Sequence, residues 1–179
     1  MANVNDPNGF TPAYHMSGGT IRPSEFAIAS ATDASIFSGD VVNLSSGLVI
    51  QGTATGTPLG VFYGVEYQAT DGSVVFSNMW TADVATLGSA NAKAFVYVDP
   101  NIVYEAQASA TPTQATIGTT NTITTTAGDT NSGRSNEAVT ATTSSGIALV
   151  QGFVQRPDNA IGQYARMLVS FPASVFGNS

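Results

Sequence analysis

Charged side chains are scarce in this sequence. Aspartate, glutamate, lysine and arginine make up 9% of its 179 residues, whereas they make up about a quarter of an ordinary globular protein. Lys93 is the only lysine and His15 the only histidine. Most enzyme chemistry needs titratable side chains held within reach of one another. We therefore expect a structural or binding protein and not an enzyme.

Other absences exclude further kinds of site and partner. The sequence contains no cysteine, which excludes disulfides, thiolate catalysis and zinc sites built on cysteine. Its basic residues are few and scattered and its net charge is -7, so it lacks the basic stripe of a nucleic-acid-binding protein. Residues 1–14 lack the basic and apolar regions of a secretory signal. No apolar run approaches the roughly 20 residues of a membrane span. We expect neither nucleic acid nor a membrane as a partner.

No pattern of residues indicates a reactive centre. His15 lies in a proline-rich segment, where a rigid scaffold for catalysis is not expected. The acidic residues show no diagnostic spacing for paired carboxylates, and the glycines form no phosphate-binding motif. We therefore assign no catalytic residue, no cofactor and no metal site.

The order of residue types predicts three segments. Residues 1–23 are expected to form an extended N-terminal arm, because Pro7, Pro12 and Pro23 oppose a helix. Residues 24–171 are expected to form one β domain, and residues 172–179 a C-terminal tail. Within the domain, residues 111–145 are rich in threonine, serine and glycine and are predicted to form a loop or tip region without buried core. Residues 122–126 in this region are a possible strand, and residues 127–136 an exposed loop.

Short β-branched and aromatic runs predict the strands of the domain. They cover residues 25–28, 40–44, 48–51, 61–68, 74–80, 93–98, 102–106, 147–154 and 165–171. Turn residues predict hairpins at 45–47, at 71–72 and at 99–101. Gly60 and Gly64 are expected to mark kinks or bulges, and Trp80 with Phe76 and Met79 is expected in the core. The fold class is therefore all-β, as a single-domain β-barrel or β-sandwich with an extended N-terminal arm.

Both ends of the chain resemble a known family. Residues 5–15 read NDPNGFTPAYH, which is similar to the opening NPxGFxPxxH pattern of small structural proteins encoded in the head-gene clusters of tailed phages. Residues 152–162 read GFVQRPDNAIG and resemble the closing GxVQRPDNxxG stretch of the same proteins. Residues 38–42 fit their early GDxV strand. Residues 53–145 match only in their β and Thr/Gly-rich character.

The resemblance implies a head decoration protein, also called a cement protein. Such a protein is located on the virion, on the outer capsid surface, where it binds the lattice of the major capsid protein and stabilises the head. The resemblance also implies a homo-oligomer, with a trimer favoured. A ligand that binds the assembled shell and not its separated subunits stabilises the shell by mass action.

Candidate partner-binding residues lie in both terminal regions. The arm is expected to add along a capsid strand, or alternatively to wrap its own subunit. Arg156 and Asp158 flank Pro157 and either set the local turn or contact another subunit. The tail either anchors on a partner or packs on its own subunit. The arm and tail candidates are Phe10, Pro12, Tyr14, Ile21, Val175 and Phe176.

A second function stays open on sequence grounds. A tail or fibre adhesin that binds host surface glycans would show aromatic side chains clustered on one solvent-facing surface. The spacing of Tyr63, Tyr67, Trp80 and Tyr97 is compatible with such a platform and equally with a core.

Overall fold

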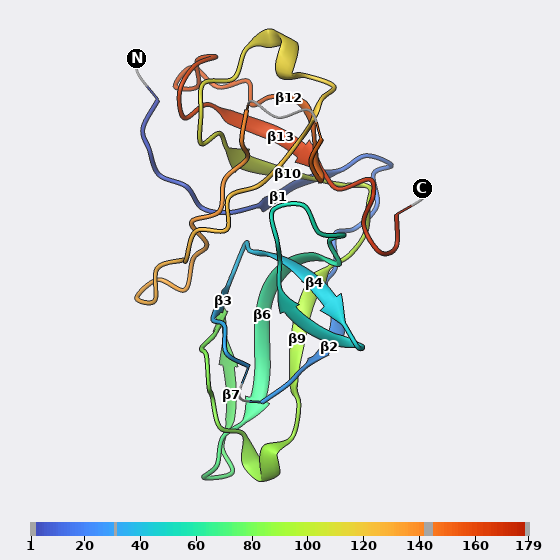
Figure 1. Ribbon diagram of the computed structural model, residues 1–179, viewed down its shortest axis with the longest axis vertical. Coiled ribbons are helices and arrows are strands. Elements are labelled where there is room, and N and C mark those ends of the chain that lie inside the picture. The colour runs from blue at the N-terminus through green and yellow to red at the C-terminus, as the bar shows by residue number, and fades with distance from the viewer. Residues whose placement is uncertain (1–2, 31, 142–144, 178–179) are drawn as a thin grey trace.

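The computed structural model describes residues 3–30, 32–141 and 145–177. These residues form an all-β domain, as predicted, with a closed barrel below a second sheet (Figure 1). The strands are β1 (Thr11–His15), β2 (Ser24–Ile28), β3 (Ile36–Phe37), β4 (Val41–Ser45), β5 (Leu48–Gln51), β6 (Gly60–Gln68), β7 (Val74–Ser77), β8 (Met79–Trp80), β9 (Ala92–Tyr97), β10 (Ile102–Gln107), β11 (Thr120–Asn121), β12 (Ala148–Phe153) and β13 (Arg166–Ser170). Two 3-10 helices, η1 (Leu87–Ser89) and η2 (Gln114–Thr116), complete the described elements.

The barrel consists of β4, β5, β2, β9 and β6, and the pairing of β4 with β6 closes it. β7 pairs with the far half of β6, and β3 pairs with β8 beside it. Two of the predicted hairpins are confirmed: β4 pairs with β5 around Ser46 and Gly47, and β6 pairs with β7 around the Asp71-Gly72 turn. Ser46 and Gly47 both have positive φ, which matches the twist that a two-residue hairpin turn needs.

The upper sheet has the strand order β1-β10-β13-β12-β11. The predicted hairpin at residues 99–101 is wrong, because β9 and β10 do not pair with each other. β9 belongs to the barrel between β2 and β6, whereas β10 lies between β1 and β13 of the upper sheet. The burial pattern explains the separation: β9 alternates buried and half-buried residues, but β10 is buried at every position except Glu105. A strand covered on both faces must sit in the middle of a packed sheet.

The N-terminal arm lies on its own chain. β1 pairs antiparallel with β10, and the preceding residues run down the side of the upper sheet (Figure 1). Phe10 is 1% exposed, and its ring packs 5.1 Å from that of Phe171. Gly9 lets the arm pass close to the barrel, since its φ is +63° and a Cβ there would lie 2.5 Å from the Gly39 carbonyl oxygen. The arm is therefore part of the fold. Of the two alternatives that the sequence left open, it wraps its own subunit.

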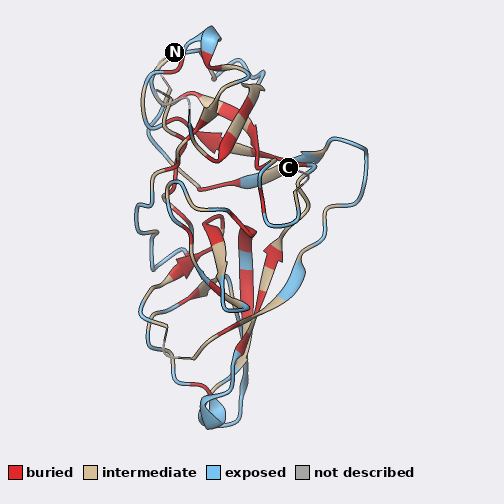
Figure 2. Cartoon of the chain, turned by 45° about the vertical axis from the view of Figure 1, so that its right-hand side comes forward, coloured by how far each residue is buried: buried red, intermediate tan, exposed pale blue. Residues whose placement is uncertain are grey.

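Two apolar clusters stabilise the molecule (Figure 2). One fills the barrel around Trp80 and Phe62, which are 0% exposed. The other lies between the upper sheet and the neighbouring end of the barrel, where Val41 and Val61 join it. Burial of apolar surface is the main favourable term in folding, so these shared residues bind the barrel to the upper sheet.

The Thr-rich region is more than a surface tip. The expectation that residues 111–145 contribute no core is wrong, because Ile123 and Val139 are 2% and 0% exposed and belong to the upper cluster. They meet in an isolated bridge, and residues 122–126 form no strand of their own. Of the predicted exposed loop at residues 127–136, residues 129–132 are exposed and project from the side of the molecule (Figure 1), whereas Gly133 and Ser135 are buried. Residues 142–144 of this region, 1–2 of the arm and 178–179 of the tail lie outside the described residues.

Candidate functional site

The arm residues proposed for partner binding divide into buried and exposed groups. Phe10 is held in the core and offers no side chain to a partner. Pro12 and Ile21 are half-buried, and Ile21 packs against the upper cluster. Tyr14 is 45% exposed on β1, so it is the arm residue that presents an aromatic surface to the outside.

Each terminal motif is hydrogen-bonded to residues that flank the other motif. The Asn3 side chain donates hydrogen bonds to the Ala160 and Gln163 carbonyl oxygens at 2.8 and 2.9 Å and accepts one from the Ala160 N–H at 3.0 Å. Arg166 donates to the Asp6 carbonyl oxygen at 2.7 Å. The arm next to the opening motif is therefore fixed to the closing motif across more than 150 residues of sequence.

Four charged residues form a cluster that includes Arg166 of this contact. Arg156 Nη2 lies 2.6 Å from Glu105 Oε1, and Arg166 Nε lies 3.9 Å from the same oxygen. Asp158 Oδ1 lies farther from Arg156, at 3.8 Å from its Nε, and the Asp158 side chain is 73% exposed. Arg156 therefore has a local role through Glu105 on β10, whereas the exposed Arg156–Asp158 pair adds little to stability. Asp158 is the member of this pair that faces outward.

The turn that holds these charges is fixed by Asn159. Its side chain donates to the Val154 and Arg166 carbonyl oxygens at 2.8 and 2.9 Å and accepts from the Arg166 N–H at 2.8 Å. A side-chain amide that makes hydrogen bonds to backbone N–H and C=O groups takes the place of another backbone segment, and it fixes a turn where no regular strand pair continues. The asparagine of the closing motif thus has a structural role that the sequence alone did not reveal.

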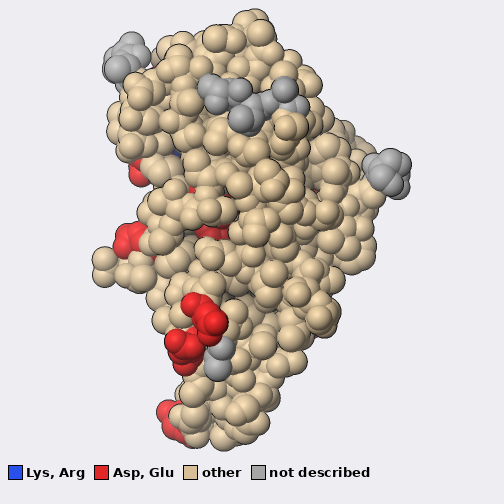
Figure 3. All heavy atoms as spheres, viewed as in Figure 1, with Lys and Arg blue, Asp and Glu red and all other residues tan. Residues whose placement is uncertain are grey.

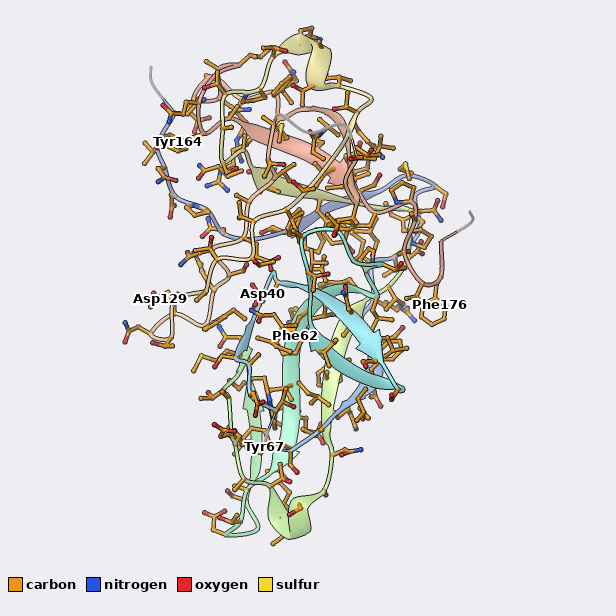
Figure 4. All side chains as sticks on the ribbon, in the orientation of Figure 1. Asp40, Phe62, Tyr67, Asp129, Tyr164 and Phe176 are labelled. Carbon is orange, nitrogen blue, oxygen red and sulfur yellow. The ribbon has the colours of Figure 1, made fainter. Side chains whose placement is uncertain are left out.

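The tail packs on its own barrel and stays half-exposed. The Val175 N–H donates to the Pro58 carbonyl oxygen at 2.9 Å, and the Phe176 ring lies 6.2 Å from that of Phe26 on β2. Val175 and Phe176 are nevertheless 42% and 55% exposed. Figure 4 shows Phe176 on the flank of the molecule beside the barrel. The tail therefore presents an apolar surface while being held in place.

A buried pair of carboxyl groups lies where the barrel meets the upper sheet (Figure 4, Asp40). Asp40 is 1% and Glu137 is 0% exposed. The Phe37 N–H donates to Asp40 and the Val41 N–H donates to Glu137, both at 2.8 Å. Within the described residues, Asp40 Oδ1 and Glu137 Oε1 have no hydrogen-bond partner. Sequence reasoning missed this pair, because Glu137 lies in the Thr-rich region that was expected at the surface.

Burial determines the protonation of this pair. Loss of hydration raises the pKa of Asp40 to about 6, partly offset by hydrogen bonds from Ser135 and Phe37. Loss of hydration, together with the charge of Asp40, raises the pKa of Glu137 to about 9. Glu137 is therefore protonated at neutral pH, which avoids two uncompensated buried charges. The pair joins the barrel to the Thr-rich region and is closed to solvent, so it has the character of a structural element.

His15 forms a hydrogen-bonded chain that resembles a catalytic triad in composition. Its Nε2 lies 2.9 Å from Asp99 Oδ2, and its Nδ1 lies 3.0 Å from Ser17 Oγ. The Ser17 and Gly19 N–H groups also donate to Nδ1, each at 3.2 Å. The hydrogen bond from His15 is the main reason why the pKa of Asp99 is lowered. Because backbone donors occupy Nδ1, the ring closes the turn after β1 and is not free to accept a proton from Ser17.

The aromatic residues considered for a glycan platform separate into two groups. Trp80 is buried, and Tyr67 packs edge-on against it at 5.5 Å. Tyr63 is 52% exposed and its ring lies 5.5 Å from that of Tyr97 on the outer barrel surface. Phe76, which was expected in the core with Trp80, is instead 70% exposed. This correction follows from the alternation of β7, which directs Phe76 away from the barrel.

Metal-binding clusters and membrane-spanning helices are absent from the part of the chain that the structure describes. Among the described residues, no group of three or more histidine and acidic side chains is placed to hold a metal ion. No helix in the described ranges has the length and apolar character needed to cross a membrane. Comparison with protein-family models, curated proteins and solved structures found no match.

Proposed function

We propose that this protein decorates the head of a tailed phage, where it binds the outer surface of the major capsid protein lattice and stabilises the shell as a homo-oligomer, a trimer in the favoured case. The observation that carries the proposal is that each family-like motif is hydrogen-bonded to a residue flanking the other: Asn3, just before the opening motif, to Ala160 of the closing motif, and Arg166, just after the closing motif, to Asp6 of the opening motif. Asn3, Asp6 and Arg166 join the arm to the closing segment. Motifs at opposite ends of a chain that assemble into one surface are expected to serve one purpose.

The surface chemistry supports the proposal. The face in Figure 3 is almost entirely uncharged, with a few acidic side chains along one edge. Burial of neutral polar surface avoids the large cost of removing ions from water. Such a surface suits close packing against neighbouring proteins, and binding to the assembled lattice stabilises it by mass action. The net charge of -7 opposes contact with DNA.

The exposed members of the candidate set define the proposed capsid contacts. Tyr14, Val175 and Phe176 present apolar surface, and Asp158 presents a charge beside the terminal motifs. Phe10 is excluded from this set by its burial. The proposal therefore differs from docking of a free arm: the arm shapes the surface, and the side chains around it make the contacts.

The first test is the number of copies per purified particle, measured by quantitative mass spectrometry against the major capsid protein. A copy number comparable to that of the shell subunit supports a lattice-bound decoration protein. A handful of copies per particle contradicts the proposal and places the protein in the tail or fibres. Absence from the particle contradicts it as well.

A second test measures binding to purified expanded shells that lack this protein. Phe176→Ala and Tyr14→Ala are expected to weaken binding about tenfold or more. Phe76→Ala is the matched control, since Phe76 is exposed but lies outside the proposed contact set. Equal binding by all three variants and the wild type would remove these residues from the proposed interface.

A further inference from the structure

A groove lined by aromatic side chains crosses the outer surface of the barrel, and neither the core nor the proposed capsid contacts account for it. It consists of two depressions of about 490 and 360 Å³ that share Ser38 and Tyr63. We call it the aromatic groove. Its principal aromatic side chains are Tyr63, Phe76, Phe95 and Tyr97, and its polar rim includes Asn8, Asn78 and Arg134.

A β-bulge places Tyr63 at the centre of the aromatic groove. In the pairing of β6 with β9, Phe62 lies opposite Val96 and Gly64 lies opposite Phe95, so Tyr63 is the extra residue. A bulge redirects the side chain of the extra residue away from the regular alternation. Tyr63 is accordingly exposed, and the neighbouring Tyr97 ring, 5.5 Å away, supports it. The sequence indicated a bulge at Gly64, although not the side chain that it turns outward.

Gly64 keeps one depression open. It lies directly opposite Phe95 and adds no side chain between Phe95 and the exposed Phe76. A Cβ at this position would lie 2.9 Å from the Ser77 carbonyl oxygen. The result is a recess bounded by aromatic rings, whose faces and edges offer apolar stacking surface.

Arg134 gives the other depression a positive charge. Lys93, Arg156 and Arg166 take part in ion pairs, but Arg134 has none within the described residues. The acidic residues on either side of it along the chain are Asp129, whose carboxylate accepts a hydrogen bond from the Asn131 N–H at 2.9 Å, and the buried Glu137, which accepts one from the Val41 N–H at 2.8 Å. An exposed, unpaired guanidinium in a chain of net charge -7 creates a local preference for an anionic group.

The loop that carries Arg134 is attached to the barrel. The Asn78 side chain donates to the Ser132 carbonyl oxygen at 2.8 Å, and the Ser38 N–H donates to the Gly133 carbonyl oxygen at 3.0 Å. The Ser135 N–H donates in turn to the Ser38 carbonyl oxygen at 3.0 Å. The backbone at Arg134 is therefore held beside the rings in the unbound protein, and a preformed site loses less entropy on binding.

We propose that the aromatic groove binds an acidic saccharide. The aromatic faces stack on the C–H faces of sugar rings, the rim amides and hydroxyls pair with sugar hydroxyls, and Arg134 pairs with the sugar carboxylate. Nucleic acid does not fit, since a single cation cannot neutralise a run of phosphates. Addition of a peptide strand does not account for the rings either, because Tyr63, Phe95 and Tyr97 lie on β6 and β9, which pair with each other, so the centre of the groove is a sheet face and not a strand edge. The inference is independent of the proposed decoration function.

Titration calorimetry of the full chain tests this inference. The probes are hexasaccharides of hyaluronan and alginate and oligomers of α2,8-linked sialic acid, with maltohexaose and cellohexaose as neutral counterparts. At least one acidic probe is expected to bind, about tenfold or more tightly than the neutral ones. Absence of binding by every acidic probe at millimolar concentration overturns the inference, as does equal binding of acidic and neutral probes.

Variants locate the site. Tyr63→Ala and Phe76→Ala are expected to weaken binding of the acidic probe about tenfold. Arg134→Gln is expected to remove the preference for acidic over neutral probes. Phe176→Ala and Tyr14→Ala are matched controls, because they delete exposed aromatic rings outside the aromatic groove. Thermal unfolding verifies that each variant is folded, and wild-type affinity in folded Tyr63→Ala and Phe76→Ala places the binding elsewhere and overturns the assignment.

Discussion

Burial of the Glu137 and Asp40 carboxyl groups costs free energy, which other interactions of the fold must offset. Each carboxyl group accepts one backbone hydrogen bond and keeps one oxygen without a partner in the described structure. A protonated carboxyl avoids most of the penalty that a buried carboxylate would incur. The stability of the fold is therefore expected to depend on pH in a range well above that in which acidic residues usually titrate.

The free energy of unfolding is expected to fall as the pH rises from 5 to 9. The folded-state pKa is about 6 for Asp40 and about 9 for Glu137, above the usual 3.8 and 4.5. The folded chain therefore binds protons more tightly than the unfolded chain. The resulting stabilisation is complete below the unfolded pKa values and is lost as the pH rises through 6 and then 9. Each proton contributes at most about 1.4 kcal/mol per pH unit.

Urea denaturation at pH 5, 7 and 9 measures this dependence. Glu137→Gln should flatten the profile between pH 7 and 9, because the substituted amide does not titrate. Asp158→Asn is the matched control, since its side chain is 73% exposed and its removal should leave the slope unchanged. The lowered pKa values of Asp71, Asp99 and Asp129 act only below their usual range near pH 4 and do not affect this window. Stability that rises between pH 5 and 9 would contradict the argument.

Gly9 allows a second test at the scale of one residue. Gly9→Ala combines an unfavourable positive φ with a Cβ only 2.5 Å from the Gly39 carbonyl oxygen and Ser135 Cβ. Gly18→Ala carries the same kind of φ, +74°, but its Cβ would meet nothing within 4 Å. We expect Gly18→Ala to cost about 1 kcal/mol and Gly9→Ala at least 1 kcal/mol more. Equal losses in chemical denaturation would show that the arm does not pass so close to the barrel.

At the scale of elements, the arm is not a free extension, because its residues Thr11–His15 form strand β1 and pair with β10. It occupies one edge of the upper sheet and places Phe10 in the cluster between sheet and barrel. Prolines in the arm predicted an extended segment correctly, because they exclude a helix whatever the segment contacts. They carry no information on which surface the segment covers, and that choice depends on residues far along the chain.

Phe10→Ala is expected to lower the free energy of unfolding by about 3–5 kcal/mol, since it removes a large side chain that is fully buried. Tyr14→Ala on the same arm should cost less than about 1 kcal/mol, because Tyr14 is 45% exposed. Denaturant titration of both variants compares the two positions directly. Similar losses would mean that the arm is not docked through Phe10.

The hairpins show where sequence reasoning holds and where it fails. Ser46-Gly47 and Asp71-Gly72 were predicted correctly, because a tight turn is determined by its own residues. The turn around Asp99 also forms, with the Asn101 N–H donating to Asp99 Oδ1 at 2.8 Å. Its flanking strands nevertheless separate into different sheets, because pairing depends on which partners cover β10. Local residues therefore predicted the turn but not the topology.

The candidate sites were predictable to different degrees. Motif spacing singled out Arg156 and Asp158, although not Glu105, which lies far away in sequence and completes the cluster. Gly64 indicated the bulge beside Tyr63. Nothing local predicted that Arg134 would lie beside these rings, because a long-range contact from Asn78 brings its loop there. Burial of Glu137 was likewise invisible in a segment of low complexity.

At the scale of the whole molecule, the low charge determines how any interface behaves. Only 9% of residues are charged, and five of the exposed or half-exposed ones, Glu25, Glu66, Lys93, Glu105 and Arg156, are paired with one another within the chain. The proposed contacts with a capsid lattice are therefore expected to depend on shape and apolar surface. Electrostatic steering, which accelerates the association of highly charged partners, contributes little.

Binding to shells is accordingly expected to change less than about threefold between 50 mM and 500 mM salt, because screening acts on charged contacts and hardly on apolar ones. Cosedimentation with purified shells across this range measures the dependence. Asp158→Ala should retain the same flat profile. A fall of an order of magnitude or more would assign the binding energy to ion pairs and contradict the interface described above.

The order of strands in the upper sheet also governs when the protein acquires its structure. β1 appears first during synthesis, but its neighbour β10 begins at Ile102, and β13, which supports β10 on the other side, ends at Ser170. The barrel strands are all complete by Tyr97. Folding is slowed when contacting segments are far apart in sequence. We therefore expect the barrel to form before the upper sheet during synthesis, and we expect a nascent chain interrupted before Ser170 to leave the apolar face of β10 uncovered and prone to aggregation or proteolysis.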